Sequence, residues 1–347
     1  MTGDKVVKTQ IGDSTMAAKK LVYMVVDTET ATLPFADSIA MADAEKKKRI
    51  AIARPLVYDI GWTLMHRDGT VFEKKHFLIA ETFSVPSVFN TAYYKEKRPL
   101  YLDMMKRGEI SVLPWETVME EFVEDLAIAD YVGAFNSMFD FKKAIPFTEL
   151  YISKLYSPNY YEWEKMQYGL CEKIAANVKP KSNPDFDPEH FTFRNNHYEM
   201  FDIWGMACET LINKVKFKQE CLENCMLSNS GDFFKTSAEA TYRYLADRYD
   251  FDEAHTALED AEIESFILSK ILAKKAITVG IDYFPFRKLG KTTDFVKNHA
   301  RGKKQAQYAR TVHSVMDDYV GDYDTEEELT NYKKQILGRM EILKSFF

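Results

Sequence analysis

The first strong pattern along the chain is an unbroken apolar run at residues 21–26, LVYMVV, followed at once by the acids Asp27 and Glu29. A run of this kind, without alternating polar positions, predicts a strand buried on both faces. Two carboxylates at the end of a buried strand must be solvated, paired or bound to a metal ion. The pattern therefore predicts a core strand that ends in an acidic pair.

Two more strands are predicted directly after the first. Residues 56–66 and 70–80 have the apolar and β-branched composition of strands, and the turn sequence RDG joins them. Later strands are predicted at 131–135 (YVGAF) and at 197–204 (HYEMFDIW). We therefore expect an antiparallel meander of three strands, followed by two strands that alternate with helices.

Apolar residues at helical spacing fill most of the remaining chain. The expected helices are residues 90–109, 114–130, 138–154, 205–227, 236–250, 256–276 and 327–347. A polar, helix-prone insertion spans 37–55, and a loop rich in Pro, Asn and Asp spans 178–196. Asp202 is expected to cap the helix that follows it. This element order predicts an α/β fold, with a five-stranded mixed sheet flanked by helices and a mostly helical C-terminal extension.

The same pattern divides the chain into three parts. Residues 1–19 are expected to form a flexible N-terminal arm, residues 20–275 the main domain, and residues 276–347 an appended basic and acidic helical region.

Composition narrows the class of protein. The 347 residues are 46% hydrophobic, which is enough for a sizeable core. No stretch approaches the roughly 18 apolar residues of a membrane span, and the polar N-terminus lacks the apolar middle of a signal peptide. The cysteines, Cys171, Cys208, Cys221 and Cys225, lack CxxC spacing, so we favour buried thiols over a zinc site. We expect a cytoplasmic protein in a reducing compartment, with no membrane partner.

The formal net charge of −7 is unevenly distributed. Residues 270–310 contain eleven Lys or Arg and two acids, a sum of +9, so the rest of the chain carries −16. Such a segment can form a positive track for a polyanion, and it can equally be an ordinary solvated surface. The sequence leaves both interpretations open.

Three further polar residues lie where predicted core elements begin or end. Asp140 follows the strand at 131–135, while His255 and Asp260 flank the start of the helix at 256–276. If Asp27 and Glu29 converge with them, the four carboxylates repel one another strongly in a pocket of low dielectric.

Divalent cations resolve that repulsion. Oxygen ligands favour Mg²⁺ or Mn²⁺ over zinc, and two such ions roughly 4 Å apart can stabilise the attacking and leaving oxygens of phosphodiester hydrolysis. An imidazole such as that of His255 can accept the proton of the attacking water. The residue types therefore indicate a metal-dependent hydrolase.

Three motifs in this order resemble those of the DEDDh 3′-to-5′ exonucleases, in the DnaQ-like superfamily. They are Asp27-x-Glu29, Asn136-x-x-Phe139-Asp140 and His255-x-Ala257-x-x-Asp260-Ala261. The resemblance covers about residues 20–275, and the histidine five positions before Asp260 separates it from the tyrosine branch of that superfamily. It implies a ribonuclease H-like fold and two divalent cations, Mg²⁺ or Mn²⁺. It also implies release of nucleoside monophosphates from 3′ ends.

The resemblance also assigns roles by position. It implies that Asp27, Glu29 and Asp260 hold one metal ion, and that Asp27 bridges to the second. Asp140 would act on the second ion through water, and His255 would be the general base. The residues expected to contact the terminal nucleotide are Thr28, Thr30, Leu33, Asn136 and Phe139.

The predicted function is a metal-dependent 3′-to-5′ exonuclease acting on single-stranded or frayed DNA ends, either in proofreading during DNA replication or on its own. DNA is favoured over RNA as the nucleic-acid partner. Two alternatives stay open: an exoribonuclease that trims RNA 3′ ends, and a module that binds nucleic acid or a polymerase partner, with the C-terminal region as the working part.

Overall fold

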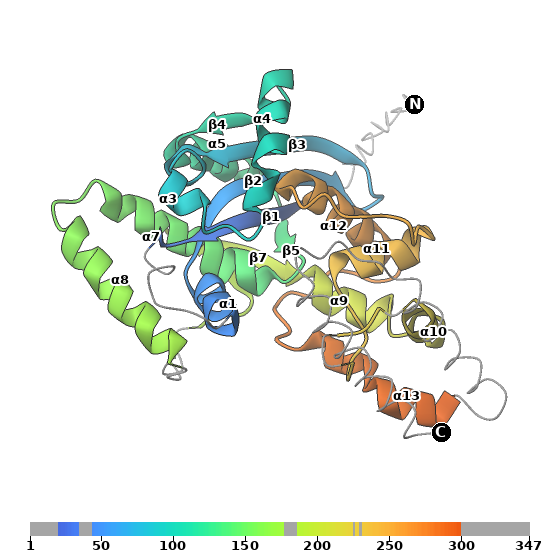
Figure 1. The fold of residues 1–347 in the computed structure, drawn as a ribbon. Coiled ribbons are helices and arrows are strands. Elements are labelled where there is room, and N and C mark those ends of the chain that lie inside the picture. The colour runs from blue at the N-terminus through green and yellow to red at the C-terminus, as the bar shows by residue number, and fades with distance from the viewer. Residues whose placement is uncertain (1–19, 35–43, 177–185, 225, 229–230, 300–347) are drawn as a thin grey trace, which may run out of the picture.

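Figure 1 shows the computed structural model of the protein, which describes residues 20–34, 44–176, 186–224, 226–228 and 231–299. The predicted arm at 1–19, the helix at 327–347 and Cys225 lie outside these ranges. Among the residues described, no helix is both long and apolar enough to cross a membrane.

A mixed sheet of seven strands forms the centre of the fold. The strands are β1 (Val22–Thr32), β2 (Pro55–His66), β3 (Val71–Ile79), β4 (Ser111–Leu113), β5 (Tyr131–Ala134), β6 (His190–Phe193) and β7 (Asn196–Asp202). Their order across the sheet is β4-β3-β2-β1-β5-β7-β6. The predicted meander is confirmed, because β1 pairs antiparallel with β2 and β2 antiparallel with β3. On the other side, β5 runs parallel to β1, and β7 runs parallel to β5.

The α/β class, with a mixed sheet flanked by helices, is confirmed, but the prediction of five strands is wrong. The two extra strands are the short β4 and β6, which lie at the sheet edges and have three and four residues. Runs this short carry too little alternation to stand out in the sequence. In addition, β6 lies inside the segment 178–196 that was predicted to be a loop.

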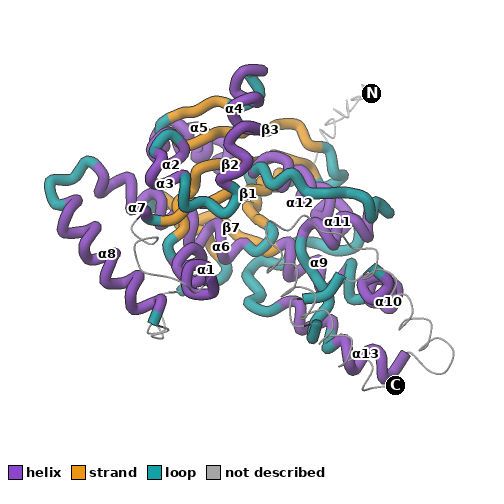
Figure 2. The backbone as a smooth tube through the Cα atoms, in the orientation of Figure 1, coloured by secondary structure: helices purple, strands orange, loops and turns teal. Residues whose placement is uncertain are grey.

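Helices cover both faces of the sheet (Figure 2). They are α1 (Ala44–Ala53), α2 (Ala80–Phe83), α3 (Pro86–Phe89), η2 (Lys95–Lys97), α4 (Arg98–Arg107), α5 (Trp115–Ile128), α6 (Ser137–Phe139), the π-helical turn η3 (Asp140–Ala144), α7 (Ile145–Leu155), α8 (Tyr160–Ala175), α9 (Ile203–Thr210), α10 (Val215–Glu223), α11 (Ala238–Ala246), α12 (Ala257–Leu272), η4 (Pro285–Leu289) and α13 (Thr292–His299). The single helix expected at 205–227 is two helices, α9 and α10, and the sequence prediction did not include α8.

Side-chain alternation along β1 explains the two layers. Tyr23 and Val25 belong to a core cluster with residues of α9 to α13, whereas Met24 and Val26 belong to a second cluster with α5 and α7. This strand is therefore buried on both faces, as its continuous apolar run predicts. Before the register shift that follows Glu29, the odd-numbered residues of β1 face the layer that contains α12.

Part of the predicted appended region packs on the main core. Leu289, Phe295 and Val296 are buried in the cluster that contains α9 to α12, and the backbone N–H of Gly280 donates to the carbonyl of Met200 in β7. Residues 300–347 lie outside the described ranges. The domain division at residue 275 stays a prediction.

Candidate metal centre and active site

The acidic pair lies inside β1, not beyond its end as predicted. Pairing with β2 continues to Thr32, and the register shifts between Glu29 and Thr30. Because side chains alternate along a strand, Asp27 and Glu29 point to the layer of α12, which contacts β1 (Figure 1). Both carboxylates are thus directed from the middle of the sheet toward the helix that carries Asp260.

The start of α12 is held close to β2 by two features of that strand. The carboxylate of Asp59 accepts a hydrogen bond from the backbone N–H of Ala257, at 3.0 Å. Gly61 leaves room for the helix, because a Cβ there would lie 2.3 Å from the backbone nitrogen of Leu258. His255 precedes the helix with a positive φ of 51°, a conformation that costs free energy and is maintained by its surroundings.

The described residues include one compact group of candidate metal ligands, formed by Glu29, His255 and Asp260. Their ligand atoms all lie within 4.8 Å of one another. The Nδ1 atom of His255 lies 3.8 Å from Oδ2 of Asp260 and 3.4 Å from Oε2 of Glu253. The structure therefore brings together residues that are more than 220 positions apart in the sequence.

Asp140 approaches from the other side of β1. The chain leaves β5, passes Asn136 with a positive φ of 76°, and enters a π-helical turn that begins at Asp140. Asp140 is buried, and its Oδ1 accepts a 2.6 Å hydrogen bond from the hydroxyl of Thr28. Thr28 is the residue between Asp27 and Glu29 in β1. Such π-helical turns are frequent at functional sites.

Asp202 fixes the loop that precedes Asp140. Its Oδ1 accepts hydrogen bonds from the backbone N–H groups of Asn136 and Ser137, at 3.1 and 3.3 Å, and its Oδ2 accepts one from Gly205, at 3.0 Å. The predicted role of Asp202 as the cap of α9 is confirmed. The same side chain also links β7 to the loop of the second motif.

Burial and mutual repulsion raise the pKa values of the acids in this site. For Asp27, burial is the largest cause, followed by the negative charges of Glu264, Asp260 and Asp140. Burial also raises the pKa of Glu29 and of Asp260. It raises the pKa of Asp140 to about 7, although the hydrogen bond from Thr28 acts to lower it. We refer to these acids, together with Glu264, as the carboxylate cluster: Asp27, Glu29, Asp140, Asp260 and Glu264.

Glu264 was not predicted from the sequence. It lies on α12, four residues after Asp260, is 2% exposed, and accepts a hydrogen bond from the backbone N–H of Phe135 at 3.0 Å. Burial, with Asp140 and Asp260 next, raises its pKa. The sequence does contain a sign of this residue: Glu264 is a second acid one helical turn beyond Asp260, on a helix face whose other residues are apolar.

Two residues from the segment before α4 also border the site and were missed. The ring of Tyr94 stacks on the imidazole of His255, with centroids 4.5 Å apart and planes 15° apart. Lys97 donates to the backbone carbonyl of Ala254, and its positive charge opposes the rise in the pKa of Glu29. No motif in the sequence linked this segment to His255, because the contact depends on the fold.

The predicted substrate residues occupy different environments. Asn136 is exposed beside the site, Thr30 is partly buried, and Phe139 packs against the core layer of α5. Thr28 is 6% exposed and bonds Asp140. Leu33 is fully buried, so a wedge against a base would require its loop to open. These contacts with a nucleotide stay predictions.

The donor set fits divalent cations on two observations. Oδ1 of Asp260 is buried and has no hydrogen-bond partner within the described ranges, which is costly for an oxygen that carries charge. The carboxylate cluster also supplies only oxygen atoms, with the imidazole of His255 at its edge, and oxygen is the ligand that Mg²⁺ and Mn²⁺ prefer.

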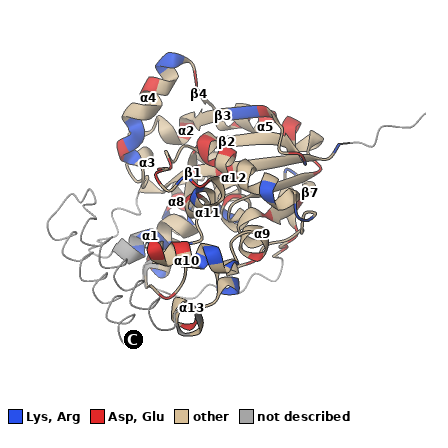
Figure 3. Cartoon of the chain, turned by 90° about the vertical axis from the view of Figure 1, so that its right-hand side faces the viewer, with Lys and Arg blue, Asp and Glu red and all other residues tan. Residues whose placement is uncertain are grey.

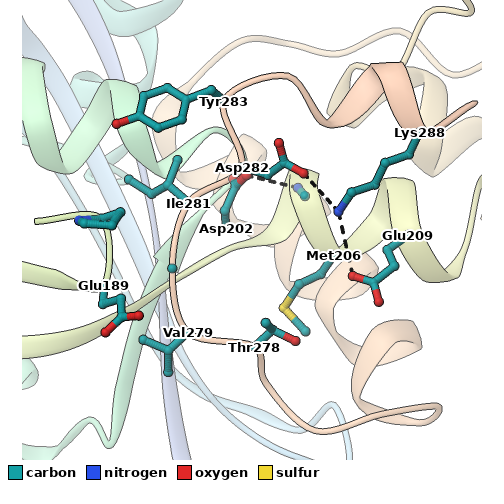
Figure 4. A pocket seen from close by; sticks show the side chains of 13 residues that line it. Glu189, Asp202, Met206, Glu209, Thr278, Val279, Ile281, Asp282, Tyr283 and Lys288 are labelled. Carbon is teal, nitrogen blue, oxygen red and sulfur yellow. Dashed lines mark hydrogen bonds and ion pairs between the residues drawn. The ribbon is translucent and has the colours of Figure 1, made fainter.

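A separate cavity of about 420 Å³ has Asp202 in its lining (Figure 4). Figure 4 shows Lys288 reaching between Asp282, at 2.9 Å, and Glu209, at 3.8 Å. No member of the carboxylate cluster lines this cavity. Asp202 lines this cavity and also holds the loop of the second motif.

The three motifs predicted from the sequence thus meet at one place in the structure. β1 supplies the first, the loop after β5 supplies the second, and the start of α12 supplies the third. Comparisons of this chain with protein-family models, with curated proteins and with solved structures gave no match.

Proposed function

We propose that this chain is a 3′-to-5′ exonuclease that uses two divalent cations, Mg²⁺ or Mn²⁺, to release nucleoside monophosphates from single-stranded or frayed DNA ends. The observation that supports it best is the gathering of Glu29, His255 and Asp260 within 4.8 Å. Asp27 and Asp140 add negative charge from two further directions. A site this acidic favours cations and, through them, a phosphate substrate.

In this proposal, the carboxylates and His255 have different roles. Asp27, Glu29, Asp140 and Asp260 would hold the cations, which when bound supply an activated water and neutralise charge on the leaving 3′ oxygen. His255 would accept the proton of the water. Glu253 and Asp260, 3.4 and 3.8 Å from Nδ1, stabilise the positive charge that the ring then carries.

The test is hydrolysis of a single-stranded DNA oligonucleotide labelled at its 5′ end, with Mg²⁺ or Mn²⁺. We expect the wild-type chain to shorten the labelled strand one nucleotide at a time. Asp27→Ala should abolish this, whereas Asp103→Ala, the same change at an exposed position on α4, should leave it unchanged. If the wild-type chain and Asp27→Ala shorten the strand equally, or neither does, the proposal fails.

The same assay distinguishes DNA from RNA. A matched RNA oligonucleotide adds a 2′-hydroxyl at each position, which a nucleotide pocket must accept or exclude. We expect faster turnover of DNA. Faster turnover of RNA would replace the proposed substrate with the exoribonuclease alternative and leave the chemistry unchanged.

A further inference from the structure

The segment YYKEKR, residues 93–98, combines aromatic and basic side chains beside the candidate active site. Tyr94 stacks on His255, and Lys97 lies 4.8 Å from the centre of the Tyr94 ring and donates to the carbonyl of Ala254. The segment therefore forms one wall of the site. Its three cations and one acid give it a charge of +2, next to a cluster of carboxylates.

The outer side of this wall is open to solvent. Tyr93 is 84% exposed, and its ring meets the Tyr94 ring edge-on, with centroids 4.8 Å apart. Lys95 is exposed as well. Within the described part of the chain, Lys95, Lys97 and Arg98 form no ion pair with a carboxylate, although the charge of Lys97 acts on Glu29. In α4, by contrast, Lys106 and Arg107 of the last turn pair with Asp103 and Glu109, and Figure 3 shows both signs of charge on this helix.

These features match what single-stranded nucleic acid requires. An exposed aromatic ring provides a face for a base, and unpaired lysines attract phosphates. A strand that approaches the carboxylate cluster meets strong repulsion, so a cationic surface at its edge is needed to hold the strand there. A protein partner would gain less from this combination, because lysine is depleted at the centre of protein–protein interfaces.

We propose that residues 93–98 bind the 3′ end of a single-stranded nucleic acid beside the active site, with Tyr93 stacked on a base and Lys95 in contact with a phosphate. This inference rests on the proposed function and specifies how its substrate is held. The contact of Tyr94 with His255 fixes the distance between this surface and the reacting end.

The test measures binding without hydrolysis, by fluorescence anisotropy of a 5′-labelled oligothymidylate in EDTA. Tyr93→Ala should weaken binding about tenfold, the range expected for loss of one stacked base. Lys95→Ala should reduce the slope of log affinity against log salt by about one. Tyr156→Ala and Lys165→Ala change exposed positions elsewhere and should bind like the wild-type chain.

An oligonucleotide with abasic residues at its 3′ end tests the stacking claim directly. Tyr93→Ala and the wild-type chain should bind it equally, because no base remains to stack. A tenfold difference that persists with the abasic strand, or the absence of a difference with the intact strand, overturns the inference. A wild-type chain that does not bind the strand overturns it too. If binding behaves as expected and hydrolysis is absent, the proposed function fails and the binding surface stands.

Discussion

Two buried carboxylates on either side of the start of α12 have opposite surroundings. Asp59 is 0% exposed and accepts three hydrogen bonds, from Nε2 of His76 at 2.8 Å, the hydroxyl of Tyr101 at 2.8 Å and the backbone N–H of Ala257 at 3.0 Å. Asp260 is 7% exposed, and its Oδ1 has no partner within the described ranges. Both residues are aspartates and both are buried, so the difference lies in the donors around them.

The difference separates an acid that the fold satisfies, Asp59, from an acid with one unsatisfied oxygen, Asp260. A buried carboxylate with donors stabilises the folded state, whereas one without donors destabilises it unless a cation supplies the missing charge. Asp59 also holds the N–H of Ala257, three residues before Asp260. Asp59, whose hydrogen bonds are satisfied, therefore helps to position Asp260, which has an unsatisfied oxygen.

The largest effect should come from exchanging these two carboxylates for carboxamides. Asp260→Asn should lower the rate of hydrolysis by more than about 10³-fold, and it should leave the metal-free protein as stable or more stable. Asp59→Asn should lower the rate by roughly 10 to 100-fold, the usual cost of disturbing a group that supports a ligand, and lower stability by about 1–3 kcal/mol. Oligonucleotide hydrolysis and urea unfolding in EDTA measure both. Equal behaviour of the two variants would remove the distinction.

The next effect concerns the proton acceptor. His255→Ala should lower the rate by roughly 10² to 10⁴-fold, the typical contribution of a general base, while the carboxylates still bind Mn²⁺. His197→Ala, an exposed histidine on β7, is the control and should be neutral. Mn²⁺ binding followed by titration calorimetry separates the two roles of His255. A rate loss explained fully by lost Mn²⁺ would make it a ligand and not a base.

A smaller effect is expected in the pH dependence of stability without metal. Burial raises the pKa of Asp140 to about 7, above its ordinary value of 3.8. Between these values folded Asp140 binds more protons than unfolded Asp140, so this residue alone should make stability fall as pH rises from about 4 to about 7, by at most about 4 kcal/mol. Asp140→Asn should remove this part of the slope, and saturating Mg²⁺ should offset it. Thermal melts in EDTA and in Mg²⁺, recorded across this pH range, measure the slope. If the wild-type chain and Asp140→Asn have the same slope, the raised pKa of Asp140 is contradicted.

The sequence was sufficient for the parts of the fold and site that depend on local pattern. The apolar run before Asp27 predicted β1, and the spacing of His255 and Asp260 predicted the start of α12. The same run led to a strand end before Asp27 and Glu29, because these acids alternate with Thr28 and Thr30, and a solvent-exposed loop has the same polar composition. Pairing with β2, which the local pattern does not contain, extends the strand through them.

The residues that sequence reasoning missed act through contacts distant in the chain. In the sequence, Asp59 is one polar position in an apolar strand. Its role as a hydrogen-bond acceptor depends on the fold, which brings His76, Tyr101 and Ala257 to its carboxylate. Tyr94 looks like part of a helix, and its role depends on the ring of His255, 161 positions later. Spacing along the chain identifies candidate ligands within a motif, but not the groups that hold the motif in place.

The smallest effect tests whether close packing at the start of α12 keeps Asp260 in place. Gly61→Ala puts a methyl group 2.3 Å from the backbone of Leu258, so the helix must shift, at a cost of about 1–3 kcal/mol. Gly169→Ala is the matched control, because nothing lies within 4 Å of its added Cβ; in a helix it should raise stability by up to about 1 kcal/mol. Urea unfolding measures both. Because the helix carries Asp260, Gly61→Ala should also weaken Mn²⁺ binding. If stability falls while Mn²⁺ binding stays at the wild-type level, the position of the ligand does not depend on this contact.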